Sequence, residues 1–144
     1  MYTANFPEDH LFAMADGEAL HKIFSNLFSN AVKYAGTTVH VQLLPAEKGN
    51  AFFTVEISND GYSIPADMKE KIFEPFYRLK ETIKQKGTGI GLSLARSLAE
   101  LHNGSLYLKD SKDGLNTFVL CLPVRPPEPA PAKQKKKKLF VNPK

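Results

Sequence analysis

The sequence predicts an α/β protein, because segments with a helical spacing of apolar residues alternate with segments in which every second residue is apolar. The helical spacing occurs in residues 20–34 and 90–101. The alternating pattern occurs in two pairs of segments, each joined by a short polar turn: 37–44 with 51–58, and 104–110 with 116–123. We therefore expect two amphipathic helices and two antiparallel β-hairpins.

Length and composition favour a single intracellular domain. A chain of 144 residues with 42% apolar content buries one sizeable core. Its single cysteine, Cys121, excludes disulfides and cysteine metal sites, and no apolar run or signal-peptide pattern is present. We expect a reducing, aqueous compartment, the cytoplasm.

The net charge of +4 is unevenly distributed. Residues 125–144 carry +6, which leaves −2 for residues 1–124. A mildly acidic body does not favour a nucleic-acid-binding face. We expect residues 1–124 to form the domain and residues 125–144 a Pro/Lys-rich linker, with the lysine run 135–138 solvated rather than bound to nucleic acid or lipid.

The segment before the first helix contains two short extended patterns, 2–6 and 11–15. Asp16 then occupies the N-cap position of the helix, and Gly36 stands where a helix commonly stops. The apolar stripe that we expect to face the core consists of Leu20, Ile23, Phe24, Leu27, Phe28 and Ala31.

Three polar residues lie along one edge of that stripe. Asn26, Asn30 and Lys33 are spaced so that they share one side of the helix, while Ser25 and Ser29 point away from it. Such an edge is either a solvated border of the core or part of a site.

The chain after the first hairpin is rich in turns and aromatic residues. A loop at 59–65 precedes a short helical pattern at 66–73, which runs into the aromatic segment 73–78. Residues 79–86 have few apolar anchors, so we expect them to be mobile.

Three alternate glycines, Gly87, Gly89 and Gly91, open the second helix. Backbone N–H groups at a helix N-terminus can approach an anion closely where no side chains intervene. The spacing and the preceding polar loop differ from the dinucleotide-binding fingerprint. In this helix we expect a core-facing stripe of Ile90, Leu94, Ala95, Leu98 and Leu101.

Four segments, 26–34, 59–65, 73–78 and 87–92, resemble in order the N, G1, F and G2 boxes of the ATP-binding catalytic domain of sensor histidine kinases, within the superfamily that includes gyrase-type ATPases. The resemblance covers residues 10–123. It implies a two-layer α/β sandwich of the Bergerat type, with a mixed, mostly antiparallel sheet of about five strands packed on three helices.

The resemblance also implies a site for ATP and Mg²⁺. Carried over by position, Asn30 is the magnesium ligand, and Lys33 and Arg78 are the catalytic residues that face the phosphates. The other nucleotide-binding positions are Asn26, Asn30, Tyr34, Asn59, Asp60, Gly61, Ile64, Phe76, Gly87, Thr88, Gly89, Gly91 and Leu92.

The G1 segment departs from the family pattern in two places. Asn59 stands where the family has the adenine-reading aspartate, and Ser63 replaces the second glycine. An asparagine can offer its oxygen to the adenine amino group or its NH₂ to a ring nitrogen. Replacing a charge-assisted hydrogen bond by a neutral one costs about 1 kcal/mol, so we expect weakened ATP binding.

The phosphoacceptor histidine of the family is missing, since none of His10, His21, His40 and His102 lies in the expected helical context. The resemblance thus implies partners: a separate helical dimerisation domain, and a receiver domain or response regulator, with a receiver domain expected to begin near Leu139. The resemblance implies the cytoplasmic portion of a membrane-anchored sensor, and for this part we expect no direct nucleic-acid or membrane contact. The alternatives are a non-catalytic interaction module that has lost nucleotide affinity, and a gyrase-like or mismatch-repair ATPase.

Overall fold

The computed structural model describes residues 1–8, 10–45, 49 and 51–125. Most of the predicted turn at 45–50, and the predicted linker and receiver strand beyond Arg125, lie outside the described residues. The elements follow the order β1 (Tyr2–Asn5), α1 (Gly17–Tyr34), β2 (Val39–Leu43), β3 (Phe52–Asn59), three 3₁₀ turns, α2 (Gly91–Leu101), β4 (Ser105–Leu108) and β5 (Asn116–Pro123).

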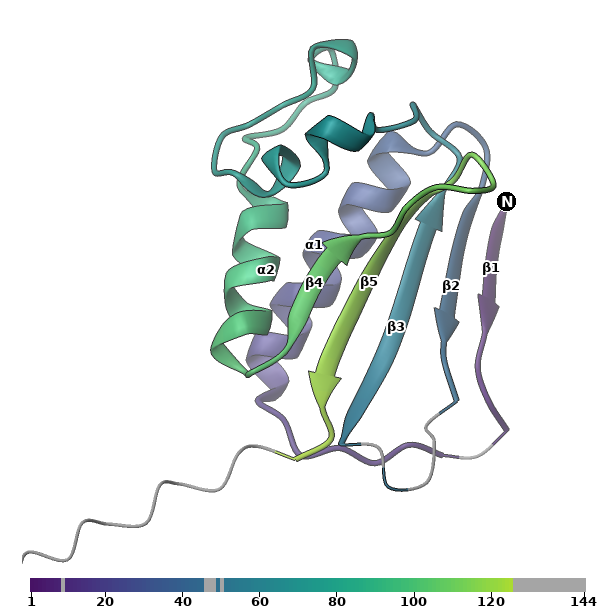
Figure 1. The fold of residues 1–144 in the computed structure, drawn as a ribbon, viewed down its shortest axis with the longest axis vertical. Coiled ribbons are helices and arrows are strands. Elements are labelled where there is room, and N and C mark those ends of the chain that lie inside the picture. The colour runs from purple at the N-terminus through teal and green to yellow at the C-terminus, as the bar shows by residue number, and fades with distance from the viewer. Residues whose placement is uncertain (9, 46–48, 50, 126–144) are drawn as a thin grey trace, which may run out of the picture.

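The five described strands form one sheet in the order β1-β2-β3-β5-β4 (Figure 1). β1 pairs with β2 in parallel, and every other described pair is antiparallel. Both predicted hairpins are confirmed, with Val41 opposite Ile57 in the first and Leu106 opposite Leu120 in the second. The alternating apolar residues of these strands face the core.

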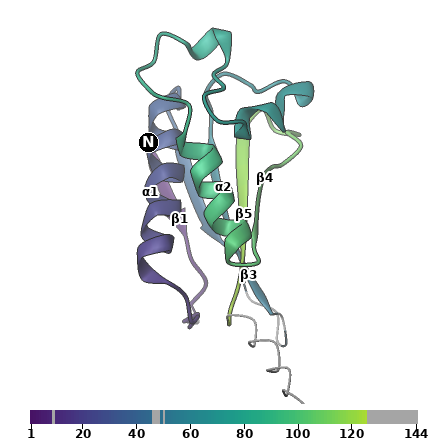
Figure 2. The ribbon, with the colours of Figure 1, turned by 90° about the vertical axis from the view of Figure 1, so that its left-hand side faces the viewer.

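Both α-helices lie on the same face of the sheet, which gives two layers (Figure 2). This arrangement confirms the predicted α/β class and the mixed, mostly antiparallel sheet. The helical stretch expected at 66–73 consists of two single 3₁₀ turns, η1 (Ala66–Met68) and η2 (Lys71–Phe73). A third turn, η3 (Lys80–Thr82), lies in the polar segment that follows.

The predicted N-cap of α1 is confirmed. One carboxylate oxygen of Asp16 accepts hydrogen bonds from the backbone N–H groups of Glu18 and Ala19 at 2.9 and 3.2 Å. Ala19, Ile23, Leu27 and Ala31 of α1 are buried, and Leu20 and Phe24 pack partly buried against the same core, as predicted. Phe28 is 39% exposed, because it stacks outward on the ring of Phe24 instead of entering the core.

The core-facing side of α2 was predicted too wide. Ala95 and Ala99 are fully buried, and these small side chains let the helix approach α1 and the sheet closely. Leu101, expected in the core, lies in the last turn of the helix and is 77% exposed. Ile90 and Leu94 are also exposed to a large extent.

The extended segment predicted at 11–15 is not a strand. It runs along the lower end of the sheet, where the backbone N–H of Met14 donates to the carbonyl of Val124. One such bond fastens the segment to the end of β5, but it does not continue into a ladder.

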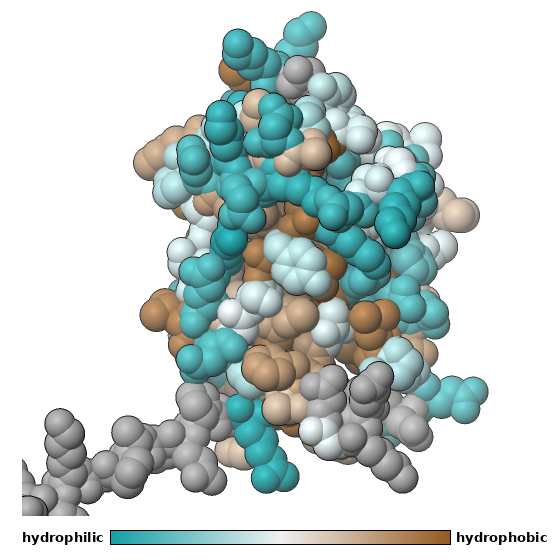
Figure 3. Space-filling view, viewed as in Figure 1, coloured by the Kyte–Doolittle hydropathy of each residue, from teal (hydrophilic) through white to brown (hydrophobic). Residues whose placement is uncertain are grey.

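No described helix covers the second face of the sheet, which is turned towards the viewer in Figure 3. Apolar side chains gather over its middle and hydrophilic ones surround them. Within this face the hydroxyls of Ser58 and Thr117 pair at 2.8 Å. Within the described part of the chain, neither α-helix has both the length and the hydropathy that a bilayer-spanning segment needs.

Candidate functional site

A cavity of about 250 Å³ opens at the end of the sheet where β3 ends and β5 begins. This volume is many times that of a water molecule. Its walls come from the last turns of α1, the loop after β3, the segment after η2 and the start of α2. The lining comprises Asn26, Ser29, Asn30, Lys33, Tyr34, Asn59, Tyr62, Ile64, Ile72, Tyr77, Arg78, Leu79, Thr82, Gly87, Thr88, Gly89, Gly91, Leu92, Asn116 and Phe118.

The polar edge of α1 forms one wall of this cavity. Asn26, Asn30 and Lys33 line it together, as their helical spacing predicts. Asn26 is oriented by its own helix, because its amide nitrogen donates to the carbonyl of Lys22 at 2.8 Å. Ser29 was expected to point away from this edge, yet it lines the cavity as well. The wall is thus wider than the predicted strip.

Lys33 supplies a cation at the mouth of the cavity. Its ammonium group lies 5.0 Å from the ring centroid of Tyr34 and has no carboxylate partner among the described residues. The ammonium also sits directly against Gly87, where a Cβ atom would overlap it. A positive charge beside an exposed glycine backbone suits an anionic ligand.

Arg78 organises the segment 77–88, here called the lid. One terminal guanidinium nitrogen donates to the carbonyl oxygens of Thr82, Ile83 and Gln85, at 3.1 Å for Ile83. The Nε atom of the same side chain is buried without a partner in the described structure. Arg78 thus lines the cavity while its charge holds the lid backbone.

The lid closes on itself at its base, where the N–H of Phe76 donates to the carbonyl of Gly89 at 2.9 Å. Both residues have left-handed backbones, with φ of 65° and 72°. At Gly89 a Cβ atom would lie 2.8 Å from the carbonyl carbon of Phe76, so only glycine fits without a shift. Phe76, predicted to contact nucleotide, does not line the cavity and is 73% exposed.

The inner end of the cavity is apolar and contains two buried amides. Asn59 and Asn116, 2% and 5% exposed, face each other as register partners of β3 and β5. Ile72 and Phe118, both buried, stand beside them in the lining. A flat apolar group with polar edges fits such an end better than an anion does.

Asp60, predicted to contact nucleotide, instead holds the loop between α1 and β2. Its carboxylate accepts from the hydroxyl of Thr37 at 2.5 Å and from the N–H groups of Gly36, Thr37 and Thr38 at 2.8 to 3.0 Å. These bonds, led by the one from the Thr37 hydroxyl and followed by that from the Thr38 N–H, lower the pKa of Asp60 well below its usual range. Asp60 is not among the residues that line the cavity.

Gly61 is likewise outside the cavity lining. Its Cα packs against the carbonyl oxygen of Tyr34 at the end of α1, and a Cβ atom would overlap that oxygen. The glycine therefore lets the loop after β3 pack against the end of α1. Its role here is a close backbone approach.

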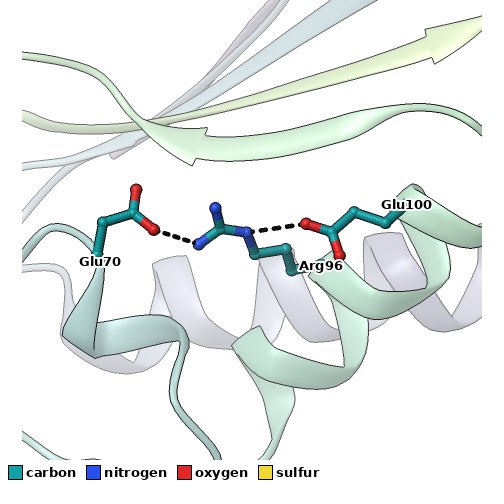
Figure 4. A network of polar contacts seen from close by, with 3 residues as sticks. All are labelled: Glu70, Arg96 and Glu100. Carbon is teal, nitrogen blue, oxygen red and sulfur yellow. Dashed lines mark hydrogen bonds and ion pairs between the residues drawn. The ribbon is translucent and has the colours of Figure 1, made fainter.

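An ionic network anchors the start of the aromatic segment (Figure 4). Arg96 of α2 bonds Glu70 at 2.9 Å and Glu100 at 3.3 Å, and its guanidinium lies 4.6 Å from the ring centroid of Phe73. Both carboxylates are exposed, so each ion pair contributes at most about 1 kcal/mol. The network nonetheless links the segment that precedes the lid to the helix that follows it.

The residues of the lining that were not predicted from the sequence are Ser29, Tyr62, Ile72, Tyr77, Leu79, Thr82, Asn116 and Phe118. Asn116, Phe118, Leu120 and Leu122 occupy every second position of one strand and therefore share a face. The apolar residues among them indicate that this face, with Asn116 on it, is turned to the core. The pattern does not show which end of that strand meets the cavity, because this depends on the order of the strands in the sheet.

The predicted metal position also faces the cavity. Asn30 lines it, and an amide oxygen is a suitable ligand for a hard cation that keeps most of its waters. Among the described residues, no three His, Cys, Asp or Glu side chains come together as a metal cluster. Asn30 would therefore be the residue that offers an oxygen to Mg²⁺ at this wall of the cavity.

Comparison with known proteins identifies the fold and its family. The sequence profile of the family described as histidine kinase-, DNA gyrase B-, and HSP90-like ATPase matches residues 15–126. The chain belongs to this ATPase family. The family predicted from the four sequence segments is therefore confirmed.

Named relatives place this ATPase-family chain in the histidine-kinase branch. Sensor histidine kinase TmoS of Ectopseudomonas mendocina is 36% identical over 125 residues, which cover 84% of this chain and 13% of TmoS. The adaptive-response sensory kinase SasA of Nostoc sp. is 34% identical over 124 residues, covering 85% of this chain and 30% of SasA. The chain thus spans less than a third of the length of these two relatives.

Solved structures agree with this assignment. The catalytic domain of histidine kinase ThkA superimposes with a TM-score of 0.74 at 26% identity, covering 87% of this chain and 79% of that domain. Full-length ShkA in complex with AMPPNP shares the fold, with a TM-score of 0.72 at 20% identity over 85% of this chain and 25% of ShkA. The ATPase-family chain is the ATP-binding module of a histidine-kinase-type protein, as predicted.

Proposed function

We propose that the cavity binds Mg·ATP and presents the γ-phosphate to a histidine on a separate helical dimerisation domain. The observation that supports the proposal is the difference between the charged mouth of the cavity and its apolar inner end. Its mouth has the ammonium of Lys33 beside Gly87, without a carboxylate partner among the described residues, and its inner end has apolar walls and two amides. A nucleotide has the same polarity, with an anionic tail and a flat base.

The residues present suit phosphoryl transfer, in which the protein mainly positions the substrate and neutralises charge. Lys33 attracts the phosphates, the glycine-rich turn before α2 leaves room for them, and Arg78 holds the lid beside them. Asn30 would hold Mg²⁺, which when bound would supply positive charge that offsets the charge of the phosphates. Transfer breaks the bond between the γ-phosphorus and ADP and forms one to an imidazole nitrogen, and ADP leaves with the electron pair.

The acceptor has to come from outside the cavity. None of His10, His21, His40 and His102 is among the lining residues. The long sensor-kinase relatives have room for additional domains beyond the part that this chain matches. We therefore include a helical phosphoacceptor domain, and a receiver domain or response regulator downstream of it, in the proposal.

Calorimetry with a non-hydrolysable ATP analogue, with and without Mg²⁺, tests nucleotide binding. We expect micromolar or weaker affinity that improves with Mg²⁺, and loss of that improvement in Asn30→Ala. The exposed Asn5 on β1 provides the matched control, since Asn5→Ala removes the same atoms far from the cavity. Absence of heat at millimolar Mg²⁺ and nucleotide would favour the non-catalytic interaction module instead.

A transfer assay tests the second half of the proposal. The 144-residue chain is incubated with γ-labelled ATP and the helical domain of its own parent protein. We expect acid-labile, base-stable label on that domain and none on this chain. Label that appears on this chain itself would contradict an external acceptor.

A further inference from the structure

The two amides at the inner end of the cavity determine which purine base it recognises. This inference rests on the proposed function, because it takes that end as the site of a nucleotide base. Asn59 and Asn116 are both buried and both line the cavity. The orientation of each amide decides whether a base meets a donor or an acceptor there.

Two backbone groups set the orientation of Asn116. Its side-chain oxygen accepts from the N–H of Ile64 at 2.9 Å, and its amide nitrogen donates to the carbonyl of Tyr62 at 2.8 Å. A backbone N–H can only donate and a carbonyl can only accept. If the amide were turned over, both bonds would be lost, so the oxygen and the nitrogen of Asn116 are assigned without ambiguity.

Asn116 in turn sets the orientation of Asn59. The amide nitrogen of Asn116 donates to the side-chain oxygen of Asn59 at 3.3 Å, and the N–H of Gly61 donates to the same oxygen at 3.1 Å. An amide oxygen has two lone pairs, so both are used. Turning Asn59 over would place its NH₂ group against two donors.

The NH₂ group of Asn59 is therefore the part that remains for a ligand. It has no hydrogen-bond partner among the described residues, although the side chain lines the cavity. A base that enters the inner end meets a hydrogen-bond donor. An aspartate at this position, as in the family pattern, would present a second oxygen and hence an acceptor.

We propose that the cavity reads the base through this donor and accepts 6-oxopurine nucleotides at least as readily as adenine nucleotides. Hypoxanthine and guanine carry an acceptor oxygen on C6, whereas adenine carries an amino donor there. The amino group of adenine and the NH₂ group of Asn59 cannot bond to each other. Adenine can meet the NH₂ group of Asn59 only through an acceptor ring nitrogen, such as N1 or N7, and its amino group then has no acceptor on this side chain.

Binding of ADP, IDP and GDP to the 144-residue chain, measured by calorimetry with Mg²⁺, tests the proposal. For the wild type we expect the dissociation constant of IDP to be equal to or lower than that of ADP. In Asn59→Asp the ratio should move about tenfold or more towards ADP, because a carboxylate accepts from the adenine amino group. Asn5→Asp makes the same chemical change on the exposed edge strand and should leave the ratio unchanged.

The ratio of the IDP and ADP dissociation constants of the wild type is measured without any variant. It therefore tests the proposal even if Asn59→Asp fails to fold. A second measurement is the side-chain amide NMR signal of Asn59, which should shift when IDP is added, while that of Asn116 shifts less. A wild-type preference for ADP of about tenfold or more would overturn this inference and leave the proposed function intact. Absence of binding by all three nucleotides would overturn both.

Discussion

Replacing Asn116 by alanine should destabilise the fold strongly, although the residue lies outside the central apolar core. The side chain makes three hydrogen bonds, to the N–H of Ile64, the carbonyl of Tyr62 and the oxygen of Asn59, at 2.9, 2.8 and 3.3 Å. Truncation removes all three at a position that is almost fully buried. Each contributes about 1 kcal/mol, and a buried group left without a partner costs about 1 to 3 kcal/mol.

We therefore expect Asn116→Ala to lower the free energy of unfolding by about 2 to 4 kcal/mol, a large part of the roughly 5 to 15 kcal/mol that stabilises a typical domain. The midpoint of thermal unfolding should fall by roughly 8 to 16 °C. The chain has no tryptophan, so urea and thermal unfolding are best followed by far-ultraviolet circular dichroism. The urea m value should stay unchanged.

Asn5→Ala is the matched control, because Asn5 is exposed on β1, and it should stay within about 0.5 kcal/mol of the wild type. A loss below about 1 kcal/mol in Asn116→Ala would refute the reasoning, since three buried hydrogen bonds could not then hold the loop after β3 in place.

Two further predictions concern the loop and the lid. The lowered pKa of Asp60 means that its stabilisation is fully present above the unfolded pKa and is lost as pH falls towards the folded one. The difference in urea midpoint between wild type and Asp60→Asn should thus be largest at neutral pH and shrink below about pH 4, and a difference that grows on acidification would contradict this. Gly89→Ala combines a left-handed backbone with overlap on Phe76, and should cost about 2 to 5 kcal/mol or displace the lid and weaken nucleotide binding. Gly114→Ala has a similar φ of 78° with open space around it, so it should cost only about 1 to 2 kcal/mol, and equal losses would show that overlap plays no part.

The sequence patterns predicted the helices and hairpins well, because each of these elements is determined by residues that are close together in the chain. The cap at Asp16, the start of α2 at the last of the three alternate glycines and the two hairpins each depend on residues close together in the chain. The width of the buried helix faces did not follow from the same patterns. Whether Phe28 or Leu101 is covered depends on where the neighbouring helix and the sheet end, which periodicity alone does not contain.

The candidate site was likewise predictable from the sequence only where its residues are close together in the chain. Asn26, Asn30 and Lys33 share a helix edge, so their spacing was enough to group them. Asn59 and Asp60 are adjacent, but one faces the cavity from the end of β3 and the other turns to the loop after α1. Asn116 reaches Asn59 across 57 residues of chain, a contact that only the strand order reveals.

The hydrogen bond at the base of the lid allows the length of the lid to change without moving the rest of the fold. Because Phe76 and Gly89 are bonded to each other, the chain between them forms a cycle whose ends stay fixed whatever it contains. The entropic cost of such a loop rises by only about 0.6 kcal/mol for each doubling of its length. Insertions within 80–86, beyond Arg78 and the core-packed Tyr77 and Leu79, should therefore alter what covers the cavity while the sheet and both helices keep their places.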